Sequence, residues 1–219
     1  MDDSKVFIYD GSFNGFLTAV FVGFEENIEI LEFQKTTSSQ KGLFSDAQNI
    51  NTQISKAKRV WDSIEKKSAT AIKNIYFSFL SETDGIEDLL FTYIKYIMGS
   101  LKPDGFEAME AISTKLTLLC GRVEREKQRI ERLVEFKSTG DNVYMAEIKS
   151  NYNVLPLISR YFRYQYPKQQ WIIFDCKRNY GVYFNLVSVE IITSEAKTLY
   201  LNSNYKNNHQ IQNNYRYAV

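Results

Sequence analysis

The segment from Phe106 to Leu133 constrains the fold of this chain more than any other part of the sequence. Its apolar residues recur every three or four positions, the spacing that places them along one side of an α-helix. No proline interrupts the segment, and a Lys-Pro-Asp-Gly loop at residues 102–105 precedes it. We therefore predict one long helix here. Its apolar arc comprises Leu116, Leu119, Cys120, Val123, Ile130, Leu133 and Val134.

The residues before this helix predict a compact parallel unit followed by shorter helices. Lys5 to Asp10 reads as a strand, Ser12 offers a helix N-cap, and the apolar spacing from Phe13 is helical. Ile28 to Phe33 reads as a second strand. Strand, helix and strand in so few residues predict a βαβ unit with a right-handed crossover. Three helices follow, in KAKRVWDSIEKK, SATAIKNIYFSFLS and GIEDLLFTYIKYIMG.

The residues after the long helix change to a strand-like pattern. LVEFKSTGDNVYMAEI predicts two strands around a turn, and NVLPLISRYFRYQYP predicts a helix. QWIIFD and GVYFN predict a hairpin, and VSVEIIT a further strand. The expected fold class is α+β, with an N-terminal βαβ unit, central helices including one long helix, and C-terminal antiparallel hairpins with an intervening helix. We expect one domain over residues 1–194 and a short Asn/Tyr-rich tail over residues 195–219.

Composition limits the classes of function. The net charge is +1, so contact with nucleic acid requires a local basic patch rather than a global field. Two cysteines far apart in sequence predict no disulfide framework. The N-terminus lacks a signal-peptide pattern, and no apolar run approaches the roughly 20 residues that cross a bilayer. A cytoplasmic protein without membrane contact is expected.

Four arginines share one side of the predicted long helix. Arg122, Arg125, Arg129 and Arg132 fall within a quarter of the helical wheel, roughly opposite the apolar arc. Arg125 and Arg129 repel each other slightly at this spacing, so helix stability alone does not favour the row. Because arginine can hold phosphate through two parallel hydrogen bonds, the row points to polyanion binding. The alternative is an ordinary solvated face, partly paired with Glu126 and other acids.

A second basic feature is interleaved with aromatic residues. Lys177 and Arg178 sit at the tip of the predicted hairpin, flanked by Tyr180, and Arg160 and Arg163 lie on the preceding predicted helix. This combination suits nucleic acid, because arginine holds the backbone while aromatic rings stack on bases. The alternative is a soluble turn beside core aromatics.

Three large aromatics of the predicted hairpin have a simpler interpretation. Trp171, Phe174 and Phe184 are expected to face the core of the sheet.

Motifs for common chemistries are missing from the sequence. The single histidine, His209, lies in the predicted tail, which leaves a catalytic triad unsupported. The chain has no zinc-ligand spacing, no phosphate-binding glycine loop and too few cysteines for the three-cysteine cluster of a radical enzyme. We therefore expect no metal and no cofactor.

Two aspartates are candidates for catalysis. Asp10 and Asp175 each end a predicted strand just before a turn, where α/β proteins often place function. They could form an acid/base or metal pair, and the alternative is turn capping. Glu87 and Asp88, by contrast, read as the solvated face of an amphipathic helix.

Five stretches carry a resemblance to a known family: FIYDGSFNGFLTAVF, GIEDLLFTYIKY, GRVEREKQRIERLVEF, YNVLPLISRYF and QWIIFDCKRNYGVYF. Spread in order over about residues 6–190, they resemble the bacterial family labelled "probable DNA metabolism protein". Members of that family accompany a radical-SAM DNA repair or modification protein, and some are fused to a uracil-DNA-glycosylase-like domain. The resemblance implies a role in DNA repair or modification, and it implies no catalytic residue.

The chain departs from the family pattern at three places. Gln128 stands before Arg129, and Tyr161 before Phe162, where relatives usually have histidine. The Asn-rich end, NYRYAV, is a short form of the usual C-terminal segment. Histidine-dependent chemistry is therefore not expected here.

Three functions follow from these observations. The first is a nucleic-acid-binding accessory protein that uses the arginine row and the hairpin and works beside the radical-SAM partner. The second is a protein-interaction module that docks this partner without touching DNA. The third is a nucleotide-directed enzyme that uses Asp10 and Asp175.

Overall fold

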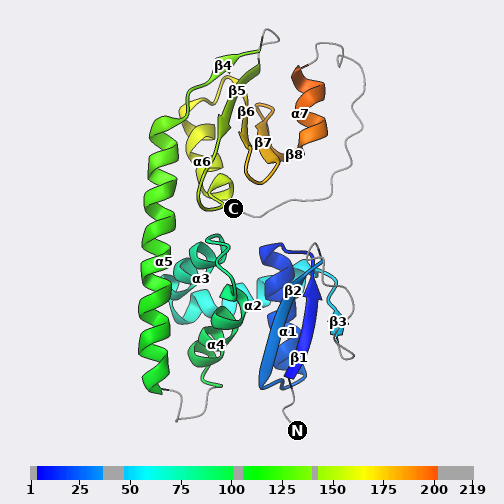
Figure 1. The fold of residues 1–219 in the computed structure, drawn as a ribbon, viewed down its shortest axis with the longest axis vertical. Helices are drawn as coiled ribbons and strands as arrows, with labels where there is room; N and C mark the ends of the chain where they lie inside the picture. Colours follow the sequence, from blue (N-terminus) through cyan, green and yellow to red (C-terminus); the bar gives the residue numbers. More distant parts are fainter. Residues whose placement is uncertain (1–3, 37–46, 101–105, 140–142, 202–219) are drawn as a thin grey trace. The chain divides into compact units, whose positions relative to one another are not determined.

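A computed structural model describes residues 4–36, 47–100, 106–139 and 143–201 of the chain (Figure 1). The expected α+β class is confirmed. The chain forms two compact units, Met1–Arg122 and Val123–Val219. Each unit is described by itself below.

The first unit contains the predicted βαβ arrangement. Its elements are β1 (Ser4–Tyr9), α1 (Phe13–Glu25), β2 (Ile30–Lys35) and β3 (Ala47–Asn49). Both β2 and β3 pair parallel with β1, giving the strand order β2-β1-β3. The strand β3 was not predicted, because the three residues Ala-Gln-Asn have no apolar pattern and pair through their backbone alone.

Helix α1 is buried on most of its surface because it lies between the sheet and other helices. From Phe13 to Phe24 it carries no charged residue. It packs against β1 and against α2 (Ile54–Lys67), and α3 (Ala69–Phe79) and α4 (Ile86–Met98) complete the layer. Phe13, Phe16 and Phe79 lie in mutual ring contact in this core. The three predicted helices are therefore confirmed.

The predicted long helix is α5 (Phe106–Leu133). Leu116, Leu119, Cys120, Val123 and Ile130 of its apolar arc are buried. Leu133, however, is 60% exposed, so its expected core position is wrong. It is the last residue of the helix, where the chain leaves the packed surface and turns towards β4.

The second unit is built on a five-stranded sheet. Its elements are β4 (Lys137–Ser138), β5 (Val143–Ile148), α6 (Leu155–Gln165), β6 (Gln170–Asp175), β7 (Tyr180–Phe184), β8 (Val189–Thr193) and α7 (Ser194–Leu201). The strand order follows the chain, β4-β5-β6-β7-β8.

One pairing in this sheet lies outside the expected hairpins. The hairpins β4–β5 and β6–β7 are confirmed and β8 pairs antiparallel with β7, while β5 and β6, whose pairing was not predicted, are parallel. A helix between two neighbouring strands carries the chain back to the starting edge of the sheet, so it produces a parallel pair. β5, α6 and β6 thus form a second βαβ unit.

The sheet of the second unit is covered on both faces. Trp171 and Phe184 pack together, and Trp171 also contacts Phe162 of α6. Phe174 joins the opposite cluster, against which Ala196 of α7 packs. The three aromatics expected in the core are buried, but on two faces rather than one. Such two-sided burial fits the continuous apolar run of β6.

The expected tail from residue 195 begins inside α7, and residues 202–219, with His209, lie outside the described residues.

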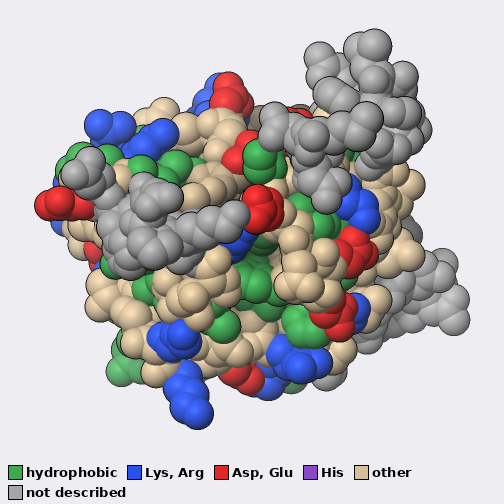
Figure 2. Space-filling view, turned by 90° about the horizontal axis from the view of Figure 1, so that it is seen from below, with side chains coloured by type: hydrophobic (Ala, Val, Ile, Leu, Met, Phe, Trp, Pro, Cys, Tyr) green, Lys and Arg blue, Asp and Glu red, His purple; other side chains and the backbone are tan. Residues whose placement is uncertain are grey.

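Basic and acidic side chains are interspersed on the face drawn in Figure 2, as the net charge of +1 leads one to expect. In the described part of the chain, the helices are too short or too polar to span a membrane.

The turn between β1 and α1 depends on a close approach of backbone and carboxylate. Asp10 accepts hydrogen bonds from the backbone N–H and hydroxyl of Ser12, at 2.8 and 2.7 Å. Its second oxygen accepts from Thr52, after β3, at 2.7 Å. A Cβ on Gly15 would lie 2.2 Å from Asp10 Oδ1, so this position has no room for a side chain.

We predict that Gly15→Ala destabilises the protein by about 1–3 kcal/mol, the usual range for overpacking, although this exchange normally stabilises a helix. Urea unfolding followed by far-UV circular dichroism measures the change. In an Asp10→Ala background the 2.2 Å contact is removed and only the contact with Thr52 Oγ1, at 2.9 Å, remains, so the same exchange should cost less. Equal costs in both backgrounds would contradict this account of the turn.

Candidate functional site

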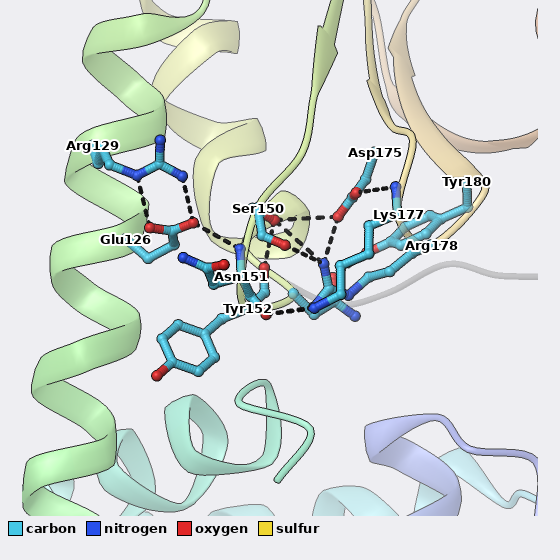
Figure 3. A network of polar contacts seen from close by, with 10 residues as sticks. Glu126, Arg129, Ser150, Asn151, Tyr152, Asp175, Lys177, Arg178 and Tyr180 are labelled. Carbon is cyan, nitrogen blue, oxygen red and sulfur yellow. Dashed lines mark hydrogen bonds and ion pairs between the residues drawn. The ribbon is translucent and has the colours of Figure 1, made fainter.

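Polar residues gather where the parallel strands β5 and β6 end. The carboxyl ends of parallel strands share one edge of a sheet, which is where α/β proteins commonly bind ligands. The loop after β5 and the turn after β6 meet at this edge, and α5 lies beside them (Figure 3). All the residues of this cluster belong to the second unit.

The centre of the turn is the carboxylate of Asp175, which is 0% exposed. Its Oδ1 accepts from the backbone N–H of Lys177 at 2.9 Å. Its Oδ2 accepts from Arg178 at 2.7 Å and from the hydroxyl of Ser150 at 3.2 Å. A buried carboxylate requires such a set of partners. The turn after β6 is therefore built around a buried ion pair.

Asn151 joins this turn to the long helix through its backbone. Its N–H donates to Glu126 Oε1 of α5 at 2.8 Å. Its carbonyl accepts from Lys177 Nζ at 3.1 Å and from Arg178 at 3.2 Å. Figure 3 shows Asn151 between the α5 pair and the basic turn. Asn151 thus links its own loop, the turn after β6 and helix α5. We call the residues joined in this way the Asn151 cluster; they are Glu126, Arg129, Ser150, Asn151, Asp175, Lys177 and Arg178.

Glu126 and Arg129 form a two-pronged ion pair on α5. Arg129 donates to both carboxylate oxygens, at 2.8 and 2.6 Å. The side chain of Glu126 is 7% exposed and that of Arg129 is 45% exposed, so the acid is covered while the base faces solvent. The hydrogen bonds from Arg129 lower the pKa of Glu126, against the opposing effect of burial, and the N–H of Asn151 adds to the lowering. The same pair raises the pKa of Arg129.

The arginine row of α5 is exposed at all four positions, Arg122, Arg125, Arg129 and Arg132. The interpretation of this row as an ordinary solvated face includes pairing with Glu126, and this pair is present for Arg129. Within the described residues, no hydrogen bond or ion pair occupies the other three arginines. The row therefore offers guanidinium groups to solvent.

The structure brings together three of the predicted basic residues. Arg129, Lys177 and Arg178 meet around Asn151. Lys177 is exposed, but the side chain of Arg178 is only 9% exposed and points inward to Asp175. Arg178 thus stabilises the turn.

The remaining predicted residues, Tyr180, Arg160 and Arg163, lie on β7 and α6. The hydroxyl of Tyr180 donates to Asn153 in the loop before α6. Arg160 and Arg163 are exposed on α6, and Arg163 lies over the ring of Phe184 at 6.0 Å. Contact with nucleic acid stays a prediction for these residues.

Sequence reasoning missed Glu126, Ser150 and Asn151 as parts of the site. A usable signal was present, since Ser150 and Asn151 follow β5 as Asp175 ends β6. Two polar strand ends meet only if the strands are parallel, and the sequence analysis made no prediction of how these two strands pair.

The two candidate catalytic aspartates lie in different units. Asp10 is bound to Ser12 and Thr52 in the first unit, and Asp175 to the turn of the second. In both, the carboxylate accepts a backbone N–H two residues on, which is the hydrogen bond of a capped turn. This favours the capping interpretation, and a catalytic role stays a prediction.

A buried polar group beside Tyr9 corrects the expectation for Glu87 of α4. Glu87 is buried rather than solvated and accepts from the hydroxyl of Tyr9 at 2.7 Å. Lys35 pairs with Glu87 at 3.0 Å. Burial, reinforced by Glu87, raises the pKa of Tyr9 far above its ordinary value. Asp88 is exposed, as expected, and accepts from the backbone N–H of Phe33, while partial burial of its carboxyl raises its pKa. Apolar spacing cannot reveal such a pairing across 78 residues.

Metal binding finds no support in the part of the chain that the structure covers. Among those residues, no group of three or more His, Cys, Asp or Glu could hold an ion.

The fold and the cluster define an α+β protein with an exposed basic row beside a polar strand edge. The family model "Domain of unknown function (DUF4130)" matches residues 84–217, more than half of the chain. The chain therefore belongs to this family. No curated protein matches the sequence. One similar solved structure is a pGpG-specific phosphodiesterase, PggH, from Vibrio cholerae, at 11% identity and a TM-score of 0.39 over 83% of this chain and 81% of that one. That likeness is too weak to carry an argument.

The lowered pKa of Glu126 predicts a pH-dependent contribution to stability. The folded state holds the ionised form, so the stabilisation is complete above the ordinary pKa of 4.5 and is lost as pH falls through the lowered value. We expect Glu126→Gln to cost about 1–2 kcal/mol near neutral pH, typical of hydrogen bonds to a charged group. The difference from wild type should shrink below pH 4.5. Urea unfolding at neutral and acidic pH measures it, with the exposed Glu135→Gln as the matched control.

Lys177 and Arg178 are adjacent in sequence but should respond differently to substitution. Arg178→Met leaves a buried carboxylate without its cation, which typically costs about 3–5 kcal/mol. Lys177→Met removes an exposed ammonium and should change stability by less than about 0.5 kcal/mol. Thermal or urea unfolding of both variants checks this. A similar loss in both would argue against the inward role of Arg178.

Proposed function

We propose that this protein binds nucleic acid through its basic surface, with Arg122, Arg125, Arg129, Arg132 and Lys177 contacting phosphates. The observation that carries the proposal is the Asn151 cluster, which joins the arginine row to the basic turn. Two basic features that are separate in the sequence thereby become one surface, as recognition of a polyanion requires.

The anchoring of the cluster favours phosphate binding over simple solvation. Glu126 holds Arg129 by one edge of its guanidinium and is itself covered, so the outer nitrogen remains available. Pre-ordered arginine loses less conformational entropy when it binds phosphate in two-pronged fashion. Arg125 and Arg132 extend the row without acidic partners among the described residues.

Arg178 has a positioning role in this proposal. Its guanidinium binds Asp175 and the carbonyls of Ser150 and Asn151, which orders the turn that presents Lys177. Its effect on binding is therefore expected through the shape of the turn rather than through a phosphate contact.

We further propose that the nucleic acid is DNA and that the protein serves a radical-SAM DNA repair or modification enzyme as an accessory. This context rests on the resemblance of the five motif stretches and not on the geometry. Co-purification with that partner at micromolar concentration tests it, and failure to associate counts against the partnership while leaving DNA binding intact.

The arginine row has a direct test in salt-dependent DNA binding. Changing Arg122, Arg125, Arg129 and Arg132 to Gln should weaken binding strongly, because each arginine that contacts a phosphate releases counterions on binding. The log-log salt slope should become shallower by about 0.7–0.9 for each phosphate that the variant no longer binds. Fluorescence anisotropy with labelled DNA across salt concentrations measures both the affinity and the slope.

The control for this test removes the same charge elsewhere. Lys58, Arg59, Lys66 and Lys73 are exposed on α2 and α3 of the first unit. Their change to Gln should leave the salt slope unchanged. The proposal fails if wild type does not bind at low salt, or if both quadruple variants behave alike.

A further inference from the structure

The chain between Glu147 and Asp175 contains no acidic residue. Elsewhere in the chain the 26 Asp and Glu residues, among 219 in all, offset the basic side chains. This stretch has none of these anions. It carries Lys149, Arg160, Arg163 and Lys168. It also forms the loop of the Asn151 cluster and the whole of α6. The unit therefore has a locally positive region that its overall composition hides.

Helix α6 is divided between a buried and an exposed side. Ile158 and Phe162 are buried, and the Phe162 ring contacts Trp171 of the sheet. The exposed side carries Arg160, Tyr161, Arg163 and Tyr164. Polar and basic residues on the solvent side are ordinary for an amphipathic helix, but exposed tyrosines are not required by it.

Among the described residues, Tyr164 is the most exposed of the large apolar and aromatic side chains, at 83%. Tyr166, by comparison, stacks on Phe162 with ring centroids 6.3 Å apart and 11° between the planes. In the described part of the chain, no hydrogen bond or ring contact engages Tyr164. Its ring is thus presented to solvent.

The neighbours of Tyr164 are suited to a phosphate backbone. Arg160 lies one helical turn before it, and residues at this spacing have Cβ atoms about 5–6 Å apart. Arg163 is adjacent in sequence and also exposed. A ring beside guanidinium groups can stack on a base while the arginines contact the neighbouring phosphates.

We propose that Tyr164, with Arg160 and Arg163, forms a base-stacking site for single-stranded nucleic acid. This inference rests on the nucleic-acid binding proposed above and specifies its substrate. In a duplex the faces of the bases are covered by their neighbours, so a ring on a helix surface meets only edges and backbone. Unpaired bases expose their faces and stack on aromatic side chains. The site therefore selects unpaired over paired strands.

The Asn151 cluster and the basic side of α6 follow one another along the chain. The helix starts at Leu155, shortly after Asn151 in the same loop. Its 11 residues span about 16 Å, a length that several unpaired nucleotides can follow. A strand held at the Asn151 cluster can thus reach Tyr164.

The test compares an oligonucleotide with bases and one without. Probes of roughly 12 nucleotides, within the range that one single-strand binding domain covers, are an oligothymidylate, an abasic strand of equal charge, and a duplex. Anisotropy titrations at fixed salt use wild type, Tyr164→Ala and Tyr164→Phe. The exposed Tyr96→Ala of α4 is the matched control.

Stacking on one base predicts that Tyr164→Ala weakens oligothymidylate binding about five-fold or more. Binding to the abasic strand and to the duplex should stay unchanged, and Tyr164→Phe should restore wild-type affinity. Equal losses on strands with and without bases, or no loss at all, overturn the inference and leave the proposed phosphate contacts standing. If wild type binds none of the probes at low salt, the proposed function itself fails.

Discussion

The buried carboxylate of Asp175 is the constraint on which the second unit depends. A charge without solvent must be surrounded by donors, and the donors come from the turn after β6, from Ser150 and from Arg178. Arg178, once drawn inward, binds the carbonyl of Asn151, whose N–H reaches Glu126 of α5. One buried charge therefore orders the strand edge and ties it to the long helix.

Both units contain a turn capped by an aspartate, but the two carboxylates differ in burial. Asp10 directly follows β1 and Asp175 ends β6, and both accept a backbone N–H two residues on. Asp10 remains exposed and closes the start of α1 over Gly15. Asp175 is fully buried because β6 is covered on both faces and because Arg178 compensates its charge. Both strands are central in their sheets, so the difference lies in the burial around each carboxylate and in the cation that Arg178 supplies to Asp175.

The α+β class, the first βαβ unit and the long helix were predictable because each depends on local periodicity and turn residues. The parallel pairing of β5 and β6 was not, because a two-residue period is the same in either direction. The cluster depended on that pairing. If β5 and β6 were antiparallel, their carboxyl ends would lie at opposite edges of the sheet, and Ser150 and Asp175 would be far apart.

The sequence by itself determined which surfaces are basic: the arginine row at helical spacing and the acid-free stretch around α6 are properties of residue order. Only the tertiary structure decided which basic groups face solvent. Arg178 and Lys177 are neighbours in the chain, yet one is held by a buried carboxylate and the other is exposed. The reason is physical, because desolvation and pairing depend on atoms brought together from distant parts of the chain, and a local pattern carries no record of them.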